Sequence, residues 1–314
     1  IERLLVNAGA SATLAMTGSA DYTVNPGAET DQGEVLSSGV PVDFDGFGSG
    51  DTLALAGTGA GTVTVNGTAA NDVFTVEKPA AVDTVTITGR ATITATALPT
   101  ATLNADEGED EFHVNGNNTL TTLNVNGGDG DDDDTLNVFN NAGAATVDLG
   151  LRTVAGYGAL INYTGLEAID ADANAQNLTV NATGGDDTVE VTPLDATSGS
   201  LQANDEDPVL NYSNLGGLFT VDLLTGGQDR LVVYGNSTDE TIDINTTPST
   251  VQASGQTITY ANAEALRVDG QEGSDTFNVT PSATTEIFID GGDAIGVVGD
   301  TLNVLAAPGD VTFA

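Results

Sequence analysis

The segment Gly184–Val191 reads GGDDTVEV, a glycine-rich acidic turn followed by a short run in which apolar and polar residues alternate. The same kind of unit returns along almost the whole chain. Its other copies are GSGDTLAL (Gly48–Leu55), TAANDVFTV (Thr68–Val76), DEGEDEFHV (Asp106–Val114), GGDGDDDDTLNV (Gly127–Val138), GGQDRLVV (Gly226–Val233), STDETIDI (Ser237–Ile244), GQEGSDTFNV (Gly270–Val279) and GDTLNV (Gly299–Val304). A turn-plus-strand unit repeated this often predicts a stack of similar coils, and it favours a function spread over an extended surface.

Apolar residues alternate inside each unit, as Phe112 and Val114 do, and the positions between them are mostly Thr, Asn, Glu and Asp. A period of two is typical of strands that bury one face. Glycine, asparagine or aspartate ends each run, and Asn66-Gly67 is a corner suited to positive φ. Helical signals are almost absent. The sequence therefore predicts an all-β protein.

The turn chemistry is the same at each return and the long chain has no break in composition, which favours stacked parallel coils over an antiparallel sandwich. Two triplets of leading aspartates have nearly the same spacing, 38 and 24 residues in one and 36 and 25 in the other: Asp72–Asp110–Asp134 and Asp239–Asp275–Asp300. Several gaps are near one or two multiples of about 20 residues, a coil length typical of β-solenoids. We expect one continuous, elongated parallel β-solenoid (β-helix-like or β-roll-like) of about 20-residue coils over residues 1–314. Asn25–Pro41 and Thr192–Asn211 lack the unit and are expected to project as loops.

The charge balance narrows the set of partners. The chain has 46 acidic and six basic residues, for a formal net charge of −40 at pH 7. Nucleic acid is excluded because phosphate binding needs clustered Lys and Arg, and anionic membrane surfaces are disfavoured for the same reason. No apolar run is long enough to insert into a membrane. Such a chain repels itself unless cations, glycans or high salt compensate.

Cysteine is absent, so disulfides and thiol chemistry are excluded. A composition poor in Cys and Lys and rich in Gly, Asn, Thr and Asp resembles that of secreted prokaryotic surface proteins. A second motif, Tyr-x-x-x-Glu-Ala-Leu/Ile, leads into a coil at YTGLEAIDA (Tyr163–Ala171) and YANAEALRV (Tyr260–Val268). The opening IERLLV (Ile1–Val6) looks like the second half of that motif. We expect a segment of a longer repeat protein or filament, whose uncapped ends stack on neighbouring solenoid.

Stacked coils would bring the acids of successive turns into columns. Unscreened, such a column costs roughly 1 kcal/mol per close pair even in water. A hard divalent cation removes that cost, and calcium prefers six to eight oxygen ligands from carboxylates, backbone carbonyls and water. The alternative is that each Gly-Asp-Asp-Thr simply forms a tight turn, in which the aspartate accepts nearby backbone N–H groups.

One family resemblance supports calcium. GQEGSDTF (Gly270–Phe277) resembles the repeat-in-toxin nonapeptide, GGxGxDx followed by an apolar residue, with Gln271 in place of one glycine. GGDGDD (Gly127–Asp132) matches its GGxGxD part and then departs from it through two further aspartates. In that family tandem nonapeptides wind into a parallel β-roll with calcium at the turns, whereas the acidic turns of this chain recur at longer, uneven intervals. The resemblance implies calcium, the one cofactor expected, at these acids: Asp129, Asp131, Asp132, Asp134, Asp186, Asp187, Asp269, Asp275, Asp293 and Asp300.

The chain as a whole resembles the long, acidic, repetitive surface proteins of bacteria, which include surface layers, fibres and giant adhesins. The resemblance rests on the recurring (Gly/Ser)-Asp-(Asp)-Thr unit and on the Tyr-x-x-x-Glu-Ala-Leu motif. It implies an extracellular structural protein, a calcium-stabilised fibre, sheath or surface-layer segment that self-associates end to end. An adhesin stalk that binds glycans, through the Thr192–Asn211 stretch or a similar projection, is the alternative.

A polysaccharide lyase or hydrolase is the remaining alternative, because parallel β-helices often carry such enzymes. A lyase of that kind usually needs a Lys or Arg base near acidic calcium ligands, and only Arg230 and Arg267 lie near acidic turns. An ion-paired structural arginine is the simpler interpretation. The single histidine, His113, has no Cys or second His to bind zinc with. We therefore expect a protein that is not an enzyme.

Overall fold

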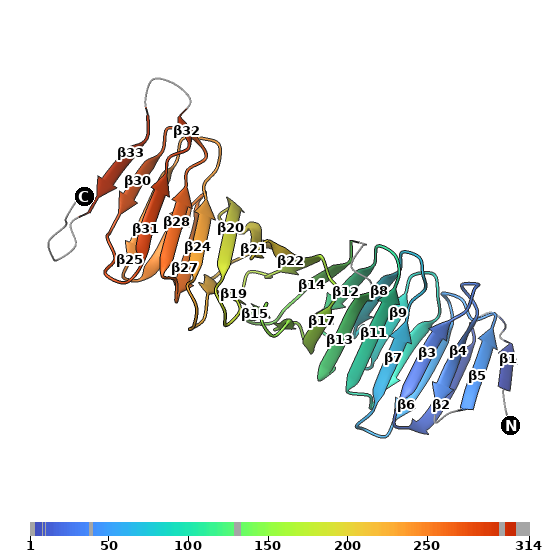
Figure 1. Ribbon diagram of the computed structural model, residues 1–314. Coiled ribbons are helices and arrows are strands. Elements are labelled where there is room, and N and C mark those ends of the chain that lie inside the picture. Colours follow the sequence, from blue (N-terminus) through green and yellow to red (C-terminus); the bar gives the residue numbers. More distant parts are fainter. Residues whose placement is uncertain are drawn as a thin grey trace. The chain divides into compact units, whose positions relative to one another are not determined.

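The computed structural model describes residues 4–7, 9, 11–37, 40–128, 133–294 and 299–305. These residues form strands, turns and bends, with no helix among them (Figure 1), so none of them forms a helix that could cross a membrane. The prediction of an all-β parallel solenoid is confirmed. The chain divides into two compact units, unit 1 (Ile1–Ala142 and Arg152–Asp170) and unit 2 (Gly143–Leu151 and Ala171–Ala314). One continuous solenoid over residues 1–314 stays a prediction.

Unit 1 has two sheets. In spatial order the first contains β1 (Leu4–Asn7), β5 (Val40–Asp45), β4 (Gly33–Ser37), β3 (Tyr22–Pro26), β7 (Thr62–Asn66), β11 (Thr100–Asp106), β13 (Thr122–Gly128), β17 (Leu160–Thr164) and β16 (Thr153–Ala155). The second contains β2 (Thr13–Ser19), β6 (Thr52–Gly57), β10 (Thr92–Thr96), β9 (Asp83–Ile87), β8 (Val73–Glu77), β12 (Glu111–Asn115) and β14 (Thr135–Phe139). The strand β18 (Ala168–Asp172) spans the division between the units.

Unit 2 repeats this arrangement. One sheet contains β15 (Ala145–Asp148), β19 (Leu178–Asn181), β23 (Phe219–Asp222), β27 (Gln256–Ala261), β26 (Ser249–Ala253), β25 (Thr241–Thr246), β30 (Thr276–Val279) and β33 (Thr301–Val304). The other contains β22 (Glu206–Ser213), β21 (Ser198–Ala203), β20 (Thr188–Asp195), β24 (Arg230–Tyr234), β28 (Ala265–Asp269) and β31 (Glu286–Asp290). A short pair, β29 (Glu272–Gly273) with β32 (Asp293–Ala294), joins two turns.

Strand register explains the uneven spacing of the acidic turns. Thr100 pairs with Thr122, 22 residues later, whereas Thr62 pairs with Thr100, 38 residues later. The longer step contains a three-stranded antiparallel meander, β8–β9–β10, in which the chain doubles back so that β10 lies beside β6. The predicted coil length of about 20 residues therefore holds for direct steps and is wrong for steps that contain a meander.

Meanders also occupy the two stretches that were expected to be loops. Asn25–Pro41 lies largely in the β3–β4–β5 meander of unit 1, and Thr192–Asn211 lies in the β20–β21–β22 meander of unit 2. The expectation of projecting loops is wrong there. Both stretches lack the acidic unit because that unit forms the turn that leads the chain into the next parallel strand. A strand that turns straight back into its own sheet does not pass through such a turn.

The core of each unit lies between its two sheets, where side chains of equivalent register stack on one another. Phe74 and Phe112 are opposite each other in β8 and β12, and their rings stack with centroids 5.1 Å apart. Leu136, the next residue in the same column, is also fully buried. The alternating residues predicted to face inward are therefore the core, and stacked rings add roughly 0.5–1.5 kcal/mol beyond their buried area.

Candidate functional site

The acidic turns form three columns of carboxylates, which we call the carboxylate ladders. Each member directly precedes a strand, and the members follow one another across neighbouring strands. Ladder 1 is Asp72, Asp110, Asp134 and Glu167 in unit 1; in unit 2, ladder 2 is Asp187, Asp229 and Glu264, and ladder 3 is Glu240, Asp275 and Asp300. The ladders hold the coils together through the same hydrogen bond, repeated at each step.

Each step of a ladder is a bond from a backbone N–H to the carboxylate of the next member. The backbone N–H of Asp72 donates to Oδ1 of Asp110 (2.6 Å), and the N–H of Asp110 donates to Oδ1 of Asp134 (2.8 Å). The N–H of Asp134 then donates to Oε2 of Glu167 (2.7 Å). These bonds are charge-assisted and lie where backbone groups have lost contact with water, so they are among the stronger hydrogen bonds a protein can form.

Ladders 2 and 3 repeat the same geometry. The backbone N–H of Asp187 donates to Oδ1 of Asp229 at 2.9 Å, and that of Asp229 donates to Oε2 of Glu264 at 2.9 Å. The N–H of Asp275 donates to Oδ1 of Asp300 at 2.9 Å. The Glu of the Tyr-x-x-x-Glu-Ala motif is thus a ladder member that ends ladders 1 and 2 after a meander. The sequence marked this motif, but no sequence signal showed what its Glu contacts.

At three of these steps the residues one position before the ladder members bond in the opposite direction, and we call these polar residues the outer row. The backbone N–H of Gln228 donates to Oδ1 of Asp186 at 2.9 Å, and that of Ser274 donates to Oδ1 of Asp239 at 2.8 Å. Asp239 is therefore an exposed outer-row residue. Its neighbour Glu240 is the ladder member, opposite Asp275 in register, so the expectation that Asp239 leads its unit is wrong by one residue.

Within single turns the ladder aspartates also accept local bonds. Oδ2 of Asp72 accepts the backbone N–H of Thr68 at 2.6 Å and its hydroxyl at 2.9 Å. Oδ2 of Asp187 accepts the N–H of Thr183 at 3.0 Å, and its Oδ1 accepts Nδ2 of Asn204 at 2.8 Å. These carboxylates behave as the tight-turn alternative expected: they close the turn through backbone and side-chain donors.

The acids expected to bind calcium fall into three groups. Asp129, Asp131 and Asp132 lie outside the described residues. Asp134, Asp187 and Asp275 are buried ladder members, and Asp300 is an exposed one. Asp186 is in the outer row. Asp269 is the last residue of β28 and accepts the N–H of Gln271 at 3.1 Å, and Asp293 is the first residue of β32. Among the described residues, no three His, Cys, Asp or Glu side chains come close enough to hold a metal ion.

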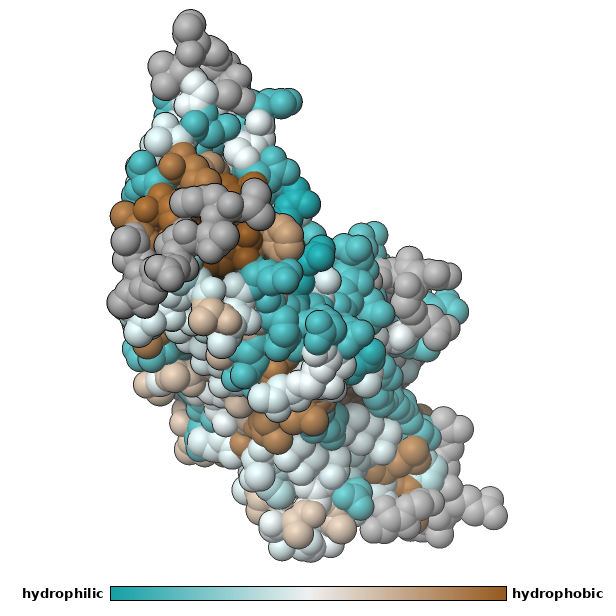
Figure 2. All heavy atoms as spheres, turned by 60° about the vertical axis from the view of Figure 1, so that its left-hand side comes forward, coloured by the Kyte–Doolittle hydropathy of each residue, from teal (hydrophilic) through white to brown (hydrophobic). Residues whose placement is uncertain are grey.

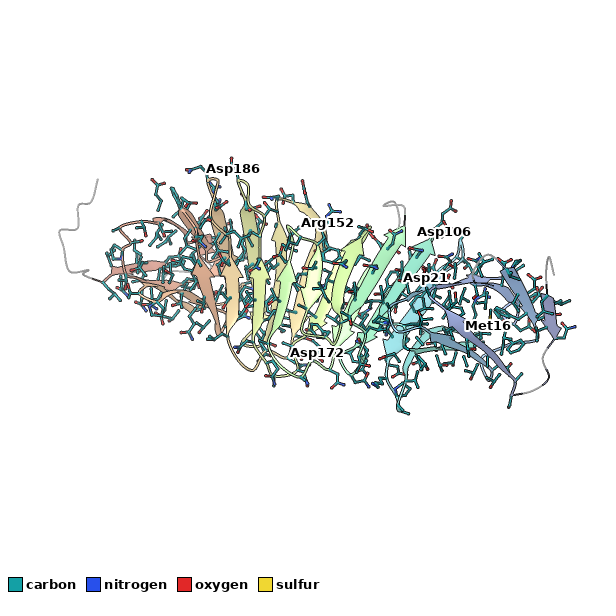
Figure 3. The ribbon with its side chains drawn as sticks, turned by 90° about the horizontal axis from the view of Figure 1, so that it is seen from below. Met16, Asp21, Asp106, Arg152, Asp172 and Asp186 are labelled. Atoms are coloured by element: carbon teal, nitrogen blue, oxygen red, sulfur yellow. The ribbon has the colours of Figure 1, made fainter. Side chains whose placement is uncertain are left out.

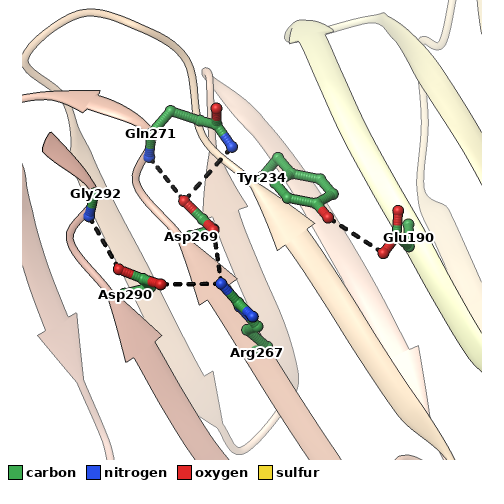
Figure 4. Close-up of polar contacts among 7 residues, drawn as sticks. All are labelled: Glu190, Tyr234, Arg267, Asp269, Gln271, Asp290 and Gly292. Carbon is green, nitrogen blue, oxygen red and sulfur yellow. Dashed lines mark hydrogen bonds and ion pairs between the residues drawn. The ribbon is translucent and has the colours of Figure 1, made fainter.

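A small ionic network joins the ends of β28 and β31, next to the turn that resembles the repeat-in-toxin motif (Figure 4). Nη2 of Arg267 lies 3.0 Å from Oδ2 of Asp269 and 2.9 Å from Oδ2 of Asp290, which joins two successive strand ends. The N–H of Gly292 donates to Oδ1 of Asp290 at 3.2 Å, as that of Gln271 does to Asp269. Arg267 is therefore ion-paired, as expected for a structural arginine. His113 is also outward-facing, and its Nε2 lies 2.8 Å from Oε2 of Glu111.

Two ladder carboxylates lie in surroundings that oppose their charge. Burial raises the pKa of Asp229 above its ordinary value of 3.8, and repulsion from Glu264, Asp187 and Asp186 raises it further. The hydrogen bond with the backbone of Asp187 acts in the opposite direction and lowers this pKa. Burial likewise raises the pKa of Asp275, with repulsion from Asp300 and Asp239. Oδ2 of Asp275 is buried and has no hydrogen-bond partner among the described residues. Ladders 2 and 3 therefore hold charge that a proton or a cation would relieve.

This electrostatic arrangement predicts that acidification stabilises the chain. For Asp229 and Asp275 the folded pKa lies above the unfolded value of 3.8, so their stabilising contribution is fully present below 3.8 and is lost as pH rises through the folded pKa. We expect the Tm in the presence of a chelator to rise as pH is lowered from about 7 toward 3.8. Circular dichroism melts measure this. The double variant Asp229→Asn, Asp275→Asn should show a flatter pH profile, and an equally steep one would contradict the assignment.

No protein-family model matches the chain, and no curated protein shows a significant match to it. Its function must therefore be argued from its own geometry.

Proposed function

We propose that the chain is a structural segment of an extracellular fibre, sheath or surface layer, in which solenoid coils stack end to end and divalent cations, calcium first, neutralise the acidic turns. The observation that carries the proposal is the open end of the solenoid core in unit 2. Leu302 of β33 continues the buried column of Phe277, yet it is 56% exposed. Ile287 and Ile289 of β31 continue the columns of β28 and are also only partly covered. Figure 2 shows hydrophobic side chains gathered on this side of unit 2.

In unit 1, core columns are also partly exposed at the first strand of each sheet. In β1, Leu4 continues the column of Val42 and is 47% exposed, and in β2, Leu14 and Met16 continue the column of β6 with partial exposure. Among the described strands β1 pairs only with β5 and β33 only with β30, so one edge of each has no described partner strand. An edge that exposes core residues is a template for adding the next coil. Two unlike edges that fit one another produce head-to-tail assembly, which grows into filaments.

The charge of the chain supports a cation in this assembly. Copies with a net charge of −40 repel one another on approach. Within ladders 2 and 3, burial raises the pKa of Asp229 and of Asp275, and repulsion between neighbouring carboxylates adds to that effect. Bound calcium would reduce both the repulsion between copies and the unneutralised charge within the ladders, because it is a hard cation that prefers carboxylate and carbonyl oxygens.

Asp275 is the described residue that best fits a calcium ligand. Its Oδ2 is buried and lacks a hydrogen-bond partner among the described residues, and it lies against the backbone of Gly270, where an added Cβ would stand 2.6 Å away. A glycine there leaves backbone oxygens free to approach an ion. The fit is partial because Oδ1 of Asp275 already accepts the N–H of Glu240. Bound calcium would supply charge neutralisation here, while the chain itself supplies a carboxylate and the glycine turn.

Calcium is expected to raise the stability of the chain in a saturable way. A ligand that binds only the folded state adds about 2.7 kcal/mol when its concentration is 100 times Kd. Thermal melts in increasing calcium, started from chelated protein at constant ionic strength, measure this. Asp275→Asn keeps the size and one acceptor oxygen of the side chain but removes its charge, and it should reduce the shift. Glu107→Ala, at an exposed acid outside the ladders, is the matched control. Equal shifts with sodium chloride at the same ionic strength would show screening only.

A further inference from the structure

The outer face of the first sheet of unit 1 carries a single charged residue, Asp106, over four neighbouring parallel strands, which is unusual in so acidic a chain. The strands β7, β11 and β13 have the sequences TVTVN, TATLNAD and TLNVNGG, and their first five residues pair in register. Thr and Asn therefore face outward in straight rows, which continue into β17 as Asn162 and Thr164. We call this surface the amide face. Neighbouring strands lie roughly 4.8 Å apart, so each row repeats at that interval.

The asparagines of the last row bond to one another across the strands. Nδ2 of Asn66 donates to Oδ1 of Asn25 at 2.7 Å, and Nδ2 of Asn104 donates to Oδ1 of Asn66 at 2.8 Å. An amide has two N–H donors and an oxygen with two lone pairs. Each of Asn66 and Asn104 therefore keeps one N–H that has no partner among the described residues. The row fixes these groups in place, which lowers the entropic cost of binding a ligand.

A hollow of about 440 Å³ lies along this row. It is lined by Asn66, Asn104, Asn126, Gly67, Gly128 and Asp106. The two glycines are close to backbone: a Cβ on Gly67 would stand 2.5 Å from the carbonyl oxygen of Ala105. Asp106 is the one charged lining residue, and it is exposed at the edge of unit 1, where β11 ends (Figure 3). The volume is within the range of about 300–1,000 Å³ typical of small-molecule sites.

We propose that the amide face and this hollow bind a neutral, extended polysaccharide. Sugar hydroxyls both donate and accept, which suits a row of fixed amides and threonine hydroxyls, and the Asp106 carboxylate accepts from two hydroxyls at once. An anionic glycan is excluded by the net charge of −40. The hollow has no aromatic lining residue, so each contact is weak. Affinity comes from repetition, because a polymer that engages one strand meets the next at a high effective concentration.

Affinity gel electrophoresis tests the proposal with soluble β-glucan, galactomannan and dextran as neutral probes and alginate as an anionic one. We expect at least one neutral polymer, and not alginate, to retard the intact chain, with or without a chelator. Asn104→Val keeps a strand-forming residue but removes the amide, and it should weaken retardation at least tenfold. Asn137→Val makes the same substitution at an outward position of β14, in the second sheet and away from the amide face, and as the matched control it should retain most of it.

Three results would overturn the proposal. The first is no retardation by any neutral polymer. The second is equal retardation of the Asn104→Val variant and the intact chain, when melting curves show both to be folded. The third is a dimer of the intact chain that Asn104→Val dissociates, because the amide face would then be an interface between copies. Assembly through the coil ends can fail without affecting any of these results, so the two proposals are tested separately.

Discussion

Replacing Asp110 with alanine is expected to lower the free energy of unfolding of unit 1 by about 2–4 kcal/mol. Asp110 is fully buried, and its Oδ1 accepts the backbone N–H of Asp72 at 2.6 Å. Its own N–H donates to Asp134 at 2.8 Å, and its carbonyl oxygen accepts the N–H of Thr135 at 2.9 Å. Alanine keeps the backbone bonds but leaves the N–H of Asp72 buried without its acceptor, which costs about 1–3 kcal/mol beyond the lost charge-assisted bond.

Urea unfolding followed by circular dichroism measures this effect, since the chain has no tryptophan for fluorescence. Asp110→Asn is the matched variant because it keeps an oxygen acceptor of the same size and removes only the charge. It should lose much less stability than Asp110→Ala. Glu107→Ala, at an exposed acid earlier in the same turn, should leave the free energy of unfolding nearly unchanged. If Asp110→Ala were no worse than Glu107→Ala, the ladder would not hold the coils together.

Introducing a charge at the open end of unit 2 is expected to abolish assembly without unfolding the chain. Leu302 faces the core column but is 56% exposed, so in isolated copies Leu302→Asp places a carboxylate largely in water. In an end-to-end contact the same carboxylate would be buried among apolar side chains with no partner, which costs several kcal/mol. We expect filament mass in pelleting assays to fall by tenfold or more.

The matched control for this variant is Asn303→Asp. It adds the same charge to the same strand, but Asn303 faces outward, where its Nδ2 donates to Asn278 at 3.0 Å. Both variants should melt close to the intact chain. If Asn303→Asp blocked assembly as strongly as Leu302→Asp, general repulsion and not contact between coil ends would explain the loss.

The strands were predictable because alternation requires only that one face be buried. The inward residues Phe112 and Val114, and the outward His113 between them, have the positions that the pattern predicted. The meanders were not predictable from the acidic unit. A strand such as β9 (Asp83–Ile87) alternates as well as any other, and only its pairing with β8 and β10 shows that the chain turns back. Alternation does not specify the direction of a strand's neighbours.

The candidate site was predictable in its location but not in its chemistry. The sequence identified Asp134, Asp187 and Asp275 as members of stacked turns, and the structure places them there. Whether such an aspartate accepts a neighbouring N–H or binds a metal depends on how the backbone of the next coil is placed against the carboxylate. The repeat pattern in the sequence does not show that placement. Glu167 and Glu264 were missed for a related reason. Their longer side chains bond back to the preceding coil across a meander, far from any Gly-Asp pair.

Electron microscopy of the chain in calcium, and again after chelation, tests the central claim most directly. We expect filaments or a lattice in calcium that dissociate when the ion is removed, because assembly needs both open coil ends and neutralised acidic turns. Isolated particles of the same length in both conditions would contradict calcium-dependent assembly. The carboxylate ladders would then stabilise the fold without taking part in assembly.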